Sequence, residues 1–250
     1  MELARAKWYF VSDLHLGLDP DTEEALQLKF INFLRSIPDD AEGLYLLGDI
    51  FDFWAEYKTV IPKGYTRVLG ALAELADRGI EVRFMRGNHD YWIGDYFEKE
   101  LGITTVLEEP QVVTLAGKQF CLAHGDALGN HSVPFLFITW MFRNPLCIAL
   151  MKLLPPKWVT RFAHRWSASS RLKHSESPYQ FRGRDDRLYK YANRFGKHQP
   201  IDYYVFGHIH SPAQISVASG GRLMILGDWI DHADYLALDS EGEVKRYKIQ

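Results

Sequence analysis

Amide, imidazole and carboxylate side chains that can bind metals or carry protons stand side by side in the stretch RGNHDYW, as Asn88, His89 and Asp90. The stretch comes directly after the apolar run EVRFM, and four more polar clusters also follow apolar runs. These clusters read DLHLG from Asp13, GDIFD from Gly48, HGD from His124 and GHIH from Gly207. Carboxylate, imidazole and amide oxygen ligands suit Mn, Fe or Zn, and the set differs from a thiolate-type zinc site.

Two of the clusters can each direct a pair of ligands into one site. In extended backbone, residues i and i+2 share a face, so Asp13 can act with His15, and His208 with His210. Each cluster alone could be an ordinary turn, with an Asx turn or a surface histidine in place of a ligand. Together the five clusters hold five of the ten histidines, and we therefore predict a binuclear metal site.

The elements that must position these clusters are short apolar strands and amphipathic helices. Apolar runs bounded by Gly or polar residues predict central strands at 8–12, 43–47, 81–85, 119–123, 203–206 and 223–226. Apolar residues at helical spacing predict helices at 22–37 and 67–79, and residues 234–250 predict a terminal hairpin. Alternating strands and helices predict an α/β fold, with the polar clusters at the carboxyl ends of strands, where ligand sites form.

Length and composition limit the class of protein. A chain of 250 residues with 47% hydrophobic and 24% charged residues suits one large α/β domain over residues 1–250. The net charge of −3 argues against nucleic-acid binding by the whole chain, and nothing indicates an obligate protein partner. Cys121 and Cys147 lack metal-binding spacing and predict reduced core thiols. The first residues show no signal-peptide pattern, so we expect a cytoplasmic location.

Residues 134–156 form the most hydrophobic segment, but Arg143, Pro145 and Lys152 interrupt it, whereas a membrane-spanning helix needs about 20 consecutive apolar residues. A buried helical pair is the favoured prediction, and an apolar lid or membrane-dipping hairpin is the alternative. The following residues 157–197 carry 11 Lys and Arg against 3 acidic residues, a net of +8, which leaves −11 for the rest of the chain. These cations either form a solvated face or, with a lid, face anionic head groups or phosphates.

The ordered set D-x-H, GD-x-x-D, GNHD, HGD and GH-x-H resembles the calcineurin-like metallophosphoesterase superfamily. That resemblance implies a two-sheet β-sandwich flanked by helices and a site for two divalent metal ions. The ligands it implies for one metal ion are Asp13, His15 and His210, and those for the other are Asn88, His124 and His208, with Asp49 bridging the two. Two metal ions in one site can clamp a phosphoryl group and stabilise the charge of an in-line attack.

The same resemblance implies that His89 and Asp52 form a catalytic pair. Because Asn88 takes a metal ion, the imidazole of His89 is left to face the substrate as a proton donor or an electrostatic clamp. Asp52 is expected to orient that imidazole, although the residue alone could also be a turn-capping carboxylate.

Within the superfamily, the motifs LYLLGDIFDFW, RGNHDYW and GHIHSPA are similar to the UDP-2,3-diacylglucosamine hydrolase family. This resemblance implies hydrolysis of the pyrophosphate of a UDP-linked lipid in lipid A biosynthesis, with Mn²⁺ as the metal. It implies a peripheral enzyme on the cytoplasmic face of the bacterial inner membrane, with residues 131–197 as a helical lid that receives acyl chains. Asn88, His89 and His208 are expected to contact the substrate as well.

The chain departs from the best-known branch of that family in two places. His89 stands where that branch has arginine, and the lid stretch ASSRLKHSES differs from the branch's ANSKEANSSK. Ser170 can be carried over as a substrate contact, His174 replaces an asparagine contact, and Arg171 and Lys173 can supply charge. A phosphodiesterase or phosphatase with another nucleotide or phosphoester substrate stays the alternative. A non-catalytic binding module is weaker, because all seven ligand positions are filled.

Overall fold

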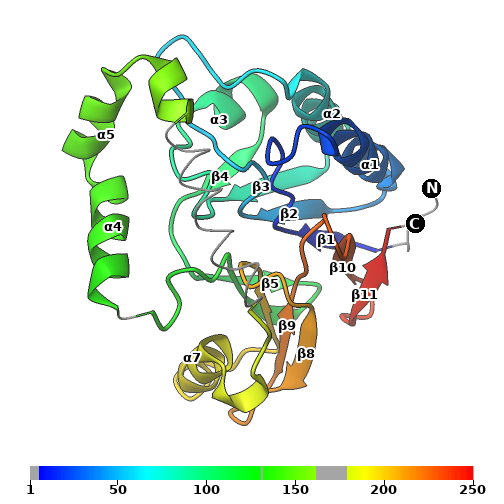
Figure 1. The fold of residues 1–250 in the computed structure, drawn as a ribbon. Coiled ribbons are helices and arrows are strands. Elements are labelled where there is room, and N and C mark those ends of the chain that lie inside the picture. The colour runs from blue at the N-terminus through cyan, green and yellow to red at the C-terminus, as the bar shows by residue number, and fades with distance from the viewer. Residues whose placement is uncertain (1–5, 131, 162–178, 250) are drawn as a thin grey trace.

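Two β-sheets lie face to face between helices in the computed structural model, which describes residues 6–130, 132–161 and 179–249 (Figure 1). The first sheet contains β1 (Trp8–Val11), β2 (Gly43–Leu47), β3 (Glu81–Met85), β4 (Thr104–Val106), β10 (Asp234–Leu238) and β11 (Val244–Lys248). The second contains β5 (Gln111–Leu115), β6 (Lys118–Ala123), β7 (Tyr203–Phe206), β8 (Ala213–Ser216) and β9 (Arg222–Ile225). Their strand orders are β11-β10-β1-β2-β3-β4 and β5-β6-β7-β9-β8.

Helices cover the outer face of each sheet. On the six-stranded sheet pack α1 (Glu23–Ser36) and α2 (Thr66–Asp77). On the five-stranded sheet packs α7 (Arg187–Phe195), which follows the 3-10 helix η1 (Gly183–Asp185). The structure also describes α3 (Tyr96–Leu101), α4 (Val133–Arg143) and α5 (Pro145–Lys152). In Figure 1, α4 and α5 stand to one side of the two sheets.

Central strands are buried on both faces, because one side of each meets helices and the other meets the second sheet. On β1, Tyr9 packs in the core beneath α1 and α2, whereas Phe10 stacks on Phe120 of β6 with ring centroids 5.7 Å apart. Burial on both faces explains why these strands read as continuous apolar runs. β1, β2 and β3 run parallel, as do β6, β7 and β9, so loops at their carboxyl ends can converge.

The fold class predicted from the sequence is confirmed, since two sheets flanked by helices build the described chain. The predicted strands and helices are present with ends shifted by at most two residues, and β10 and β11 form the terminal hairpin. Cys121 lies in β6 and is buried, as predicted. Cys147 lies on α5 and is partly exposed, so the prediction of a core thiol is wrong there.

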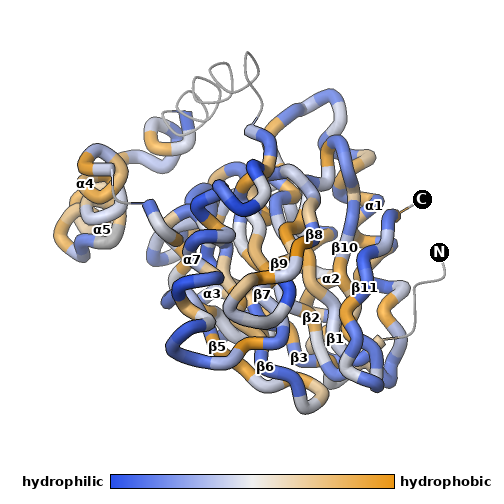
Figure 2. The backbone as a smooth tube through the Cα atoms, turned by 90° about the horizontal axis from the view of Figure 1, so that it is seen from below, coloured by the Kyte–Doolittle hydropathy of each residue, from blue (hydrophilic) through white to orange (hydrophobic). Residues whose placement is uncertain are grey.

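The apolar segment predicted as a buried helical pair is a helical pair, but it is not buried. Many of its large side chains are exposed, among them Phe137 at 62%, Trp140 at 57% and Leu146 at 67%. The outer faces of the sheets are already covered by α1, α2 and α7, so α4 and α5 find no sheet surface to bury them. Figure 2 shows the hydrophobic residues of both helices on a part of the chain that stands off the body.

The described residues include no single helix that is long and apolar enough to cross a membrane. Taken together, Val133–Phe142 and Pro145–Lys152 reach that length and composition, with a bend of 61° between them. Asn144 makes the joint, because its side chain accepts the N–H groups of Leu146 and Cys147 and so begins α5.

Candidate metal centre

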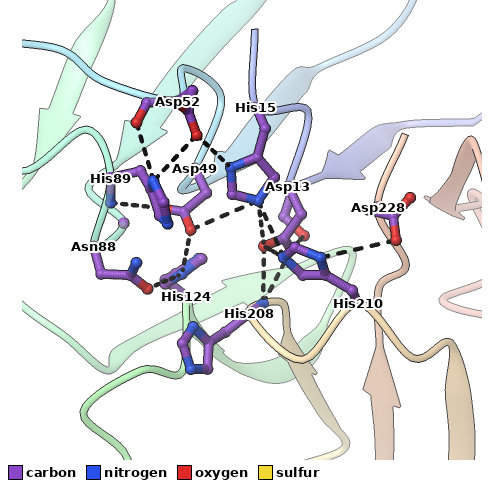
Figure 3. Close-up of polar contacts among 12 residues, drawn as sticks. Asp13, His15, Asp49, Asp52, Asn88, His89, His124, His208, His210 and Asp228 are labelled. Atoms are coloured by element: carbon purple, nitrogen blue, oxygen red, sulfur yellow. Dashed lines mark hydrogen bonds and ion pairs between the residues drawn. The ribbon is translucent and has the colours of Figure 1, made fainter. Parts of the chain in front are cut away.

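Loops from the carboxyl ends of five strands converge at one place (Figure 3). Each supplies a predicted ligand directly after its strand. The ligands, in the order β1, β2, β3, β6 and β7, are Asp13, Asp49, Asn88, His124 and His208. The two sheets therefore jointly build the site, because the first three strands belong to one sheet and the last two to the other.

Five predicted ligands adopt left-handed backbone conformations, which non-glycine residues rarely do. Their φ angles are 55° at Asp13, 50° at His15, 53° at Asp49, 71° at His208 and 53° at His210. Strained backbone of this kind clusters at functional sites. The expectation that the D-x-H and H-x-H pairs share a face of extended backbone is therefore wrong, because tight left-handed turns direct these side chains instead.

Glycines beside the ligands are required by close approach of the backbone. A Cβ atom at Gly207 would lie 2.6 Å from Oδ2 of Asp13, and one at Gly48 would lie 2.7 Å from Nδ1 of His124. Either contact would displace a candidate ligand. The glycines of GDIFD and GHIH therefore serve the packing of the site as well as its turns.

Asp13, His15 and His210 form one group of potential ligands, with donor atoms within 4.8 Å of one another. Nε2 of His210 is 3.0 Å from Nε2 of His15 and 3.3 Å from Oδ1 of Asp13. The main-chain N–H of His208 donates to both oxygens of Asp13, at 3.2 and 3.0 Å, and the Ser12 hydroxyl donates at 2.5 Å. These donors hold the Asp13 carboxylate in place beside the two imidazoles.

Asp49, His124 and His208 form a second such group, and His15, Asp52 and His89 form a third. Nε2 of His124 is 3.3 Å from Oδ2 of Asp49 and 3.1 Å from Oδ1 of Asn88. Nδ1 of His124 lies 2.9 Å from the main-chain oxygen of Leu47 and donates to it, which leaves Nε2 to face the site. The rings of His124 and His208 have centroids 5.2 Å apart.

Asp49 lies between the two groups. Its Oδ2 is 3.3 Å from Nε2 of His124 and 3.9 Å from Nε2 of His15, while its Oδ1 accepts the main-chain N–H of His89 at 2.8 Å. Burial alone would raise the pKa of Asp49, but the neighbouring His124, His89 and His15 outweigh burial and lower it well below its usual value. Asp49 is therefore an ionised carboxylate that can face two cations at once.

His89 stands at the open edge of the site, with its side chain 22% exposed. Its Nδ1 is 3.0 Å from the main-chain oxygen of Asp52 and 3.4 Å from the carboxylate of the same residue. Burial lowers the pKa of His89, but the carboxylates of Asp49 and Asp52 outweigh burial and raise it to about 9. In the metal-free protein the ring is therefore protonated near neutral pH.

The donor set fits two divalent metal ions. The Nε2 atoms of His15 and His210 face one another beside Asp13, an arrangement in which a cation would accept both lone pairs. Asp49 supplies a carboxylate to each group. All nine residues predicted as metal ligands or catalytic residues thus lie together, and no thiolate lies among them. The predicted lid contacts Ser170, Arg171, Lys173 and His174 lie outside the described residues.

Asp90, the third member of the Asn-His-Asp triplet, stabilises the loops that carry the candidate ligands. Its carboxylate accepts the N–H groups of Gly87 at 2.7 Å and Ile50 at 2.8 Å, so it ties together the loops that carry Asn88 and Asp49. Burial, followed by the charge of Asp49, raises the pKa of Asp90 to about 7.

Two carboxylates near the site escaped the sequence analysis. Asp228 has Oδ2 3.9 Å from Nδ1 of His210, and it follows β9 in a Gly-Asp pair like that of Asp49, so the same pattern could have identified it. Glu109 accepts the main-chain N–H of His124 at 2.9 Å. Burial and then Asp126 raise the pKa of Glu109 to about 7, and no sequence pattern marks this residue.

The helical pair rests on the two loops that supply His89 and Asp52. Phe142, near the end of α4, packs against Trp92 with ring centroids 5.3 Å apart, and Nε1 of Trp92 donates to the main-chain oxygen of Phe142 at 3.3 Å. Trp92 in turn contacts Phe53, which follows Asp52, with centroids 5.7 Å apart. An apolar surface and a metal centre are thereby joined through three aromatic rings.

Two helix-flanked sheets place carboxylates and imidazoles in neighbouring groups at one edge, an arrangement suited to divalent metal ions that act on phosphoesters. A model of the calcineurin-like phosphoesterase family matches residues 6–212, and the chain belongs to this family.

Relatives of the chain are similar over nearly its whole length. A UDP-2,3-diacylglucosamine hydrolase of Porphyromonas gingivalis is 38% identical over 253 residues, which cover 94% of this chain and 95% of the relative. A protein of the same name from Stenotrophomonas maltophilia is 32% identical over 241 residues, covering 93% of this chain and 95% of the relative. One from Ectopseudomonas mendocina is 32% identical over 240 residues, covering 93% and 94%.

Proposed function

We propose that the protein hydrolyses the pyrophosphate of UDP-2,3-diacylglucosamine to UMP and 2,3-diacylglucosamine 1-phosphate in lipid A biosynthesis. The observation that carries this proposal is the contact between Trp92 and Phe142, which joins an ionic centre to an exposed apolar helical pair. A substrate with a pyrophosphate at one end and acyl chains at the other needs both surfaces. The name shared by relatives that align with 93–94% of this chain supports the same substrate.

Two divalent metal ions are part of the proposal, with Mn²⁺ preferred, and Fe or Zn compatible, because the donors are imidazole, carboxylate and amide oxygen. When bound, such ions polarise a phosphoryl oxygen and lower the pKa of an attacking water. The residues that would hold them are Asp13, His15 and His210 on one side and Asn88, His124 and His208 on the other, with Asp49 between.

His89 supplies the proposed proton. The main-chain oxygen of Asp52 accepts its Nδ1–H, so the Nε2–H is left to donate to a phosphoryl oxygen or to the leaving group. The main-chain N–H of His89 donates to Asp49, so the loop that carries the proton donor is fixed to the carboxylate between the two ligand groups. Asn88 and His208 border the same space and are proposed as further substrate contacts.

A lid over residues 131–197 is proposed to receive the acyl chains. The exposed side chains of α4 and α5 supply apolar surface, and each CH₂ group buried there contributes about 0.8 kcal/mol to binding. The contacts proposed on the rest of the lid are Ser170, Arg171, Lys173 and His174.

We also propose that the protein works in the cytoplasm, at the cytoplasmic face of the bacterial inner membrane, as a peripheral protein. Exposed apolar residues on α4 and α5 are followed by the exposed cations Lys157 and Arg161, and five more exposed cations occur between residues 182 and 197. Apolar side chains next to basic ones favour binding to anionic lipid surfaces.

Trp140→Asp should weaken binding to vesicles that contain phosphatidylglycerol by about tenfold or more, because an exposed indole is replaced by a charge. Sedimentation with vesicles at increasing salt measures the effect, and binding by the unaltered protein should weaken as salt rises. Leu107→Asp is the matched control, since Leu107 is 45% exposed but lies outside the helical pair. Equal binding by the Trp140 variant and the unaltered protein would remove the membrane proposal.

The substrate is tested with purified protein, Mn²⁺, UDP-2,3-diacylglucosamine in detergent micelles and ¹⁸O-labelled water. We expect UMP that carries one ¹⁸O atom by mass spectrometry, because water then attacks the α-phosphorus. Label in the lipid phosphate instead would keep the substrate and reject the site of attack. No turnover, together with rapid hydrolysis of a soluble phosphodiester in the same buffer, would reject the substrate and favour another phosphoester.

A further inference from the structure

Two imidazoles of the metal centre, those of His124 and His15, point Nε2 towards the site and Nδ1 towards a protein oxygen. His124 has Nε2 3.3 Å from Asp49 and donates from Nδ1 to the main-chain oxygen of Leu47 at 2.9 Å. His15 has Nε2 3.9 Å from Asp49 and Nδ1 3.9 Å from the carboxylate of Asp52. An acceptor at Nδ1 fixes the tautomer and leaves the Nε2 lone pair for a metal ion.

His210 repeats this orientation, and its Nδ1 faces the Asp228 carboxylate at ion-pair distance (Figure 3). Nε2 of His210 lies 3.3 Å from Asp13, whereas its Nδ1 lies 3.9 Å from Oδ2 of Asp228. The His210 side chain is 39% exposed, compared with 1% for His15. Packing therefore constrains the His210 ring less than the His15 ring, so a fixed carboxylate contributes more to the orientation of His210.

The carboxylate of Asp228 is itself held firmly. Its Oδ1 accepts the main-chain N–H groups of Ile230 at 3.0 Å and Asp231 at 2.6 Å, and its Oδ2 faces Nδ1 of His232 at 3.3 Å. The side chain is 6% exposed. The next residue, Trp229, donates its main-chain N–H to the main-chain oxygen of Asp13 at 3.1 Å, which fixes the turn against the metal centre. Asp228 is thus a buried, hydrogen-bonded carboxylate beside the metal centre.

We propose that Asp228 is a positioning residue for His210: its carboxylate keeps the proton on Nδ1 of His210 and so keeps Nε2 available to a divalent metal ion, while His232 holds the carboxylate in place. This inference rests on the proposed metal centre and deepens it. Asp228 then favours the Nδ1 proton of His210 through its charge, whereas the Leu47 carbonyl favours that of His124 through a hydrogen bond.

The test is a calorimetric titration of the full-length, chelator-treated protein with Mn²⁺, comparing the unaltered protein with Asp228→Asn and Asp231→Asn. Asparagine keeps an oxygen for the two N–H groups of the turn but presents an NH₂ group to His210. We expect a 10- to 100-fold loss of affinity at one of the two sites, as for other partners of metal-binding histidines, and an unchanged second site. Asp231 is exposed, so Asp231→Asn removes the same charge nearby and should bind Mn²⁺ like the unaltered protein.

The titration distinguishes the role of Asp228 from the proposed binding of metal ions. If the unaltered protein binds no Mn²⁺, the metal centre itself is wrong and the inference falls with it. If the unaltered protein and a folded Asp228→Asn variant bind two ions equally well, only the role of Asp228 is wrong. Equal weakening of both sites with a lower unfolding temperature also contradicts it. If the variant fails to fold, ¹⁵N chemical shifts of the His210 ring in the unaltered, metal-free protein decide, and a proton on Nε2 alone overturns the inference.

Discussion

Replacing His89 by alanine should lower kcat by about 10²- to 10⁴-fold, the range that a positioned general acid contributes, while both metal ions stay bound. The imidazole lies at the open edge of the site and hydrogen bonds to Asp52. The contact between residue 89 and Asp49 is made by the main chain, so it survives the loss of the side chain. We therefore expect the ring to act on the substrate and not on the metal ions.

Steady-state rates at saturating Mn²⁺, with metal content measured by mass spectrometry, test this division of roles. Asp52→Asn is the informative companion, because the main-chain oxygen of residue 52 still accepts the Nδ1–H of His89. Its kcat should fall by less than that of His89→Ala. Loss of metal from the His89 variant would contradict the role assigned to the ring. A larger loss in the Asp52 variant would mean that the carboxylate matters more than the carbonyl.

Asp49→Asn should abolish the binuclear centre and lower kcat by about 10³-fold or more, since the metal pair supplies several kcal/mol and each 1.36 kcal/mol is a factor of ten. One carboxylate oxygen of Asp49 faces both His15 and His124. Asparagine keeps an oxygen for the N–H of His89 but removes the negative charge between the two ligand groups. Binding of the two ions should therefore fail together.

The measurement is the rise in unfolding temperature that Mn²⁺ causes, because a ligand that binds only the folded state stabilises it. We expect that rise to be absent in Asp49→Asn. Asp90→Asn is the matched control, since Asp90 is also fully buried but contacts N–H groups of the loops. It should lower the unfolding temperature of the metal-free protein and keep a rise with Mn²⁺. Normal metal stabilisation of the Asp49 variant would show that another group bridges the ions.

The sequence by itself determined the strands and the residues that follow them. Strands covered by helices on one side and by a sheet on the other must be apolar at nearly every position, so runs such as GLYLL in β2 could be recognised from the sequence. Polar residues directly after such runs, including Asp49 and His124, could only lie at the edge where parallel strands end together. The α/β class and the convergence of the polar clusters were predictable for this reason, whereas the two-sheet fold and the ligand set were implied by the family resemblance.

The tertiary structure alone decided how the ligands are directed and what lies behind them. Left-handed turns at Asp13 and His210 depend on close packing of loops from two sheets, and spacing along the chain carries no record of that packing. Asp228 meets His210 only because β9 ends beside β7.

The exposure of α4 and α5 was decided in the same way. Transfer of hydrophobic side chains such as Phe137 and Trp140 out of water is favourable, but their burial also requires a second surface to pack against. The outer faces of the two sheets are already covered by α1, α2 and α7. The sequence shows how hydrophobic each segment is. Which segments cover the limited area of the sheets is decided only in the folded chain.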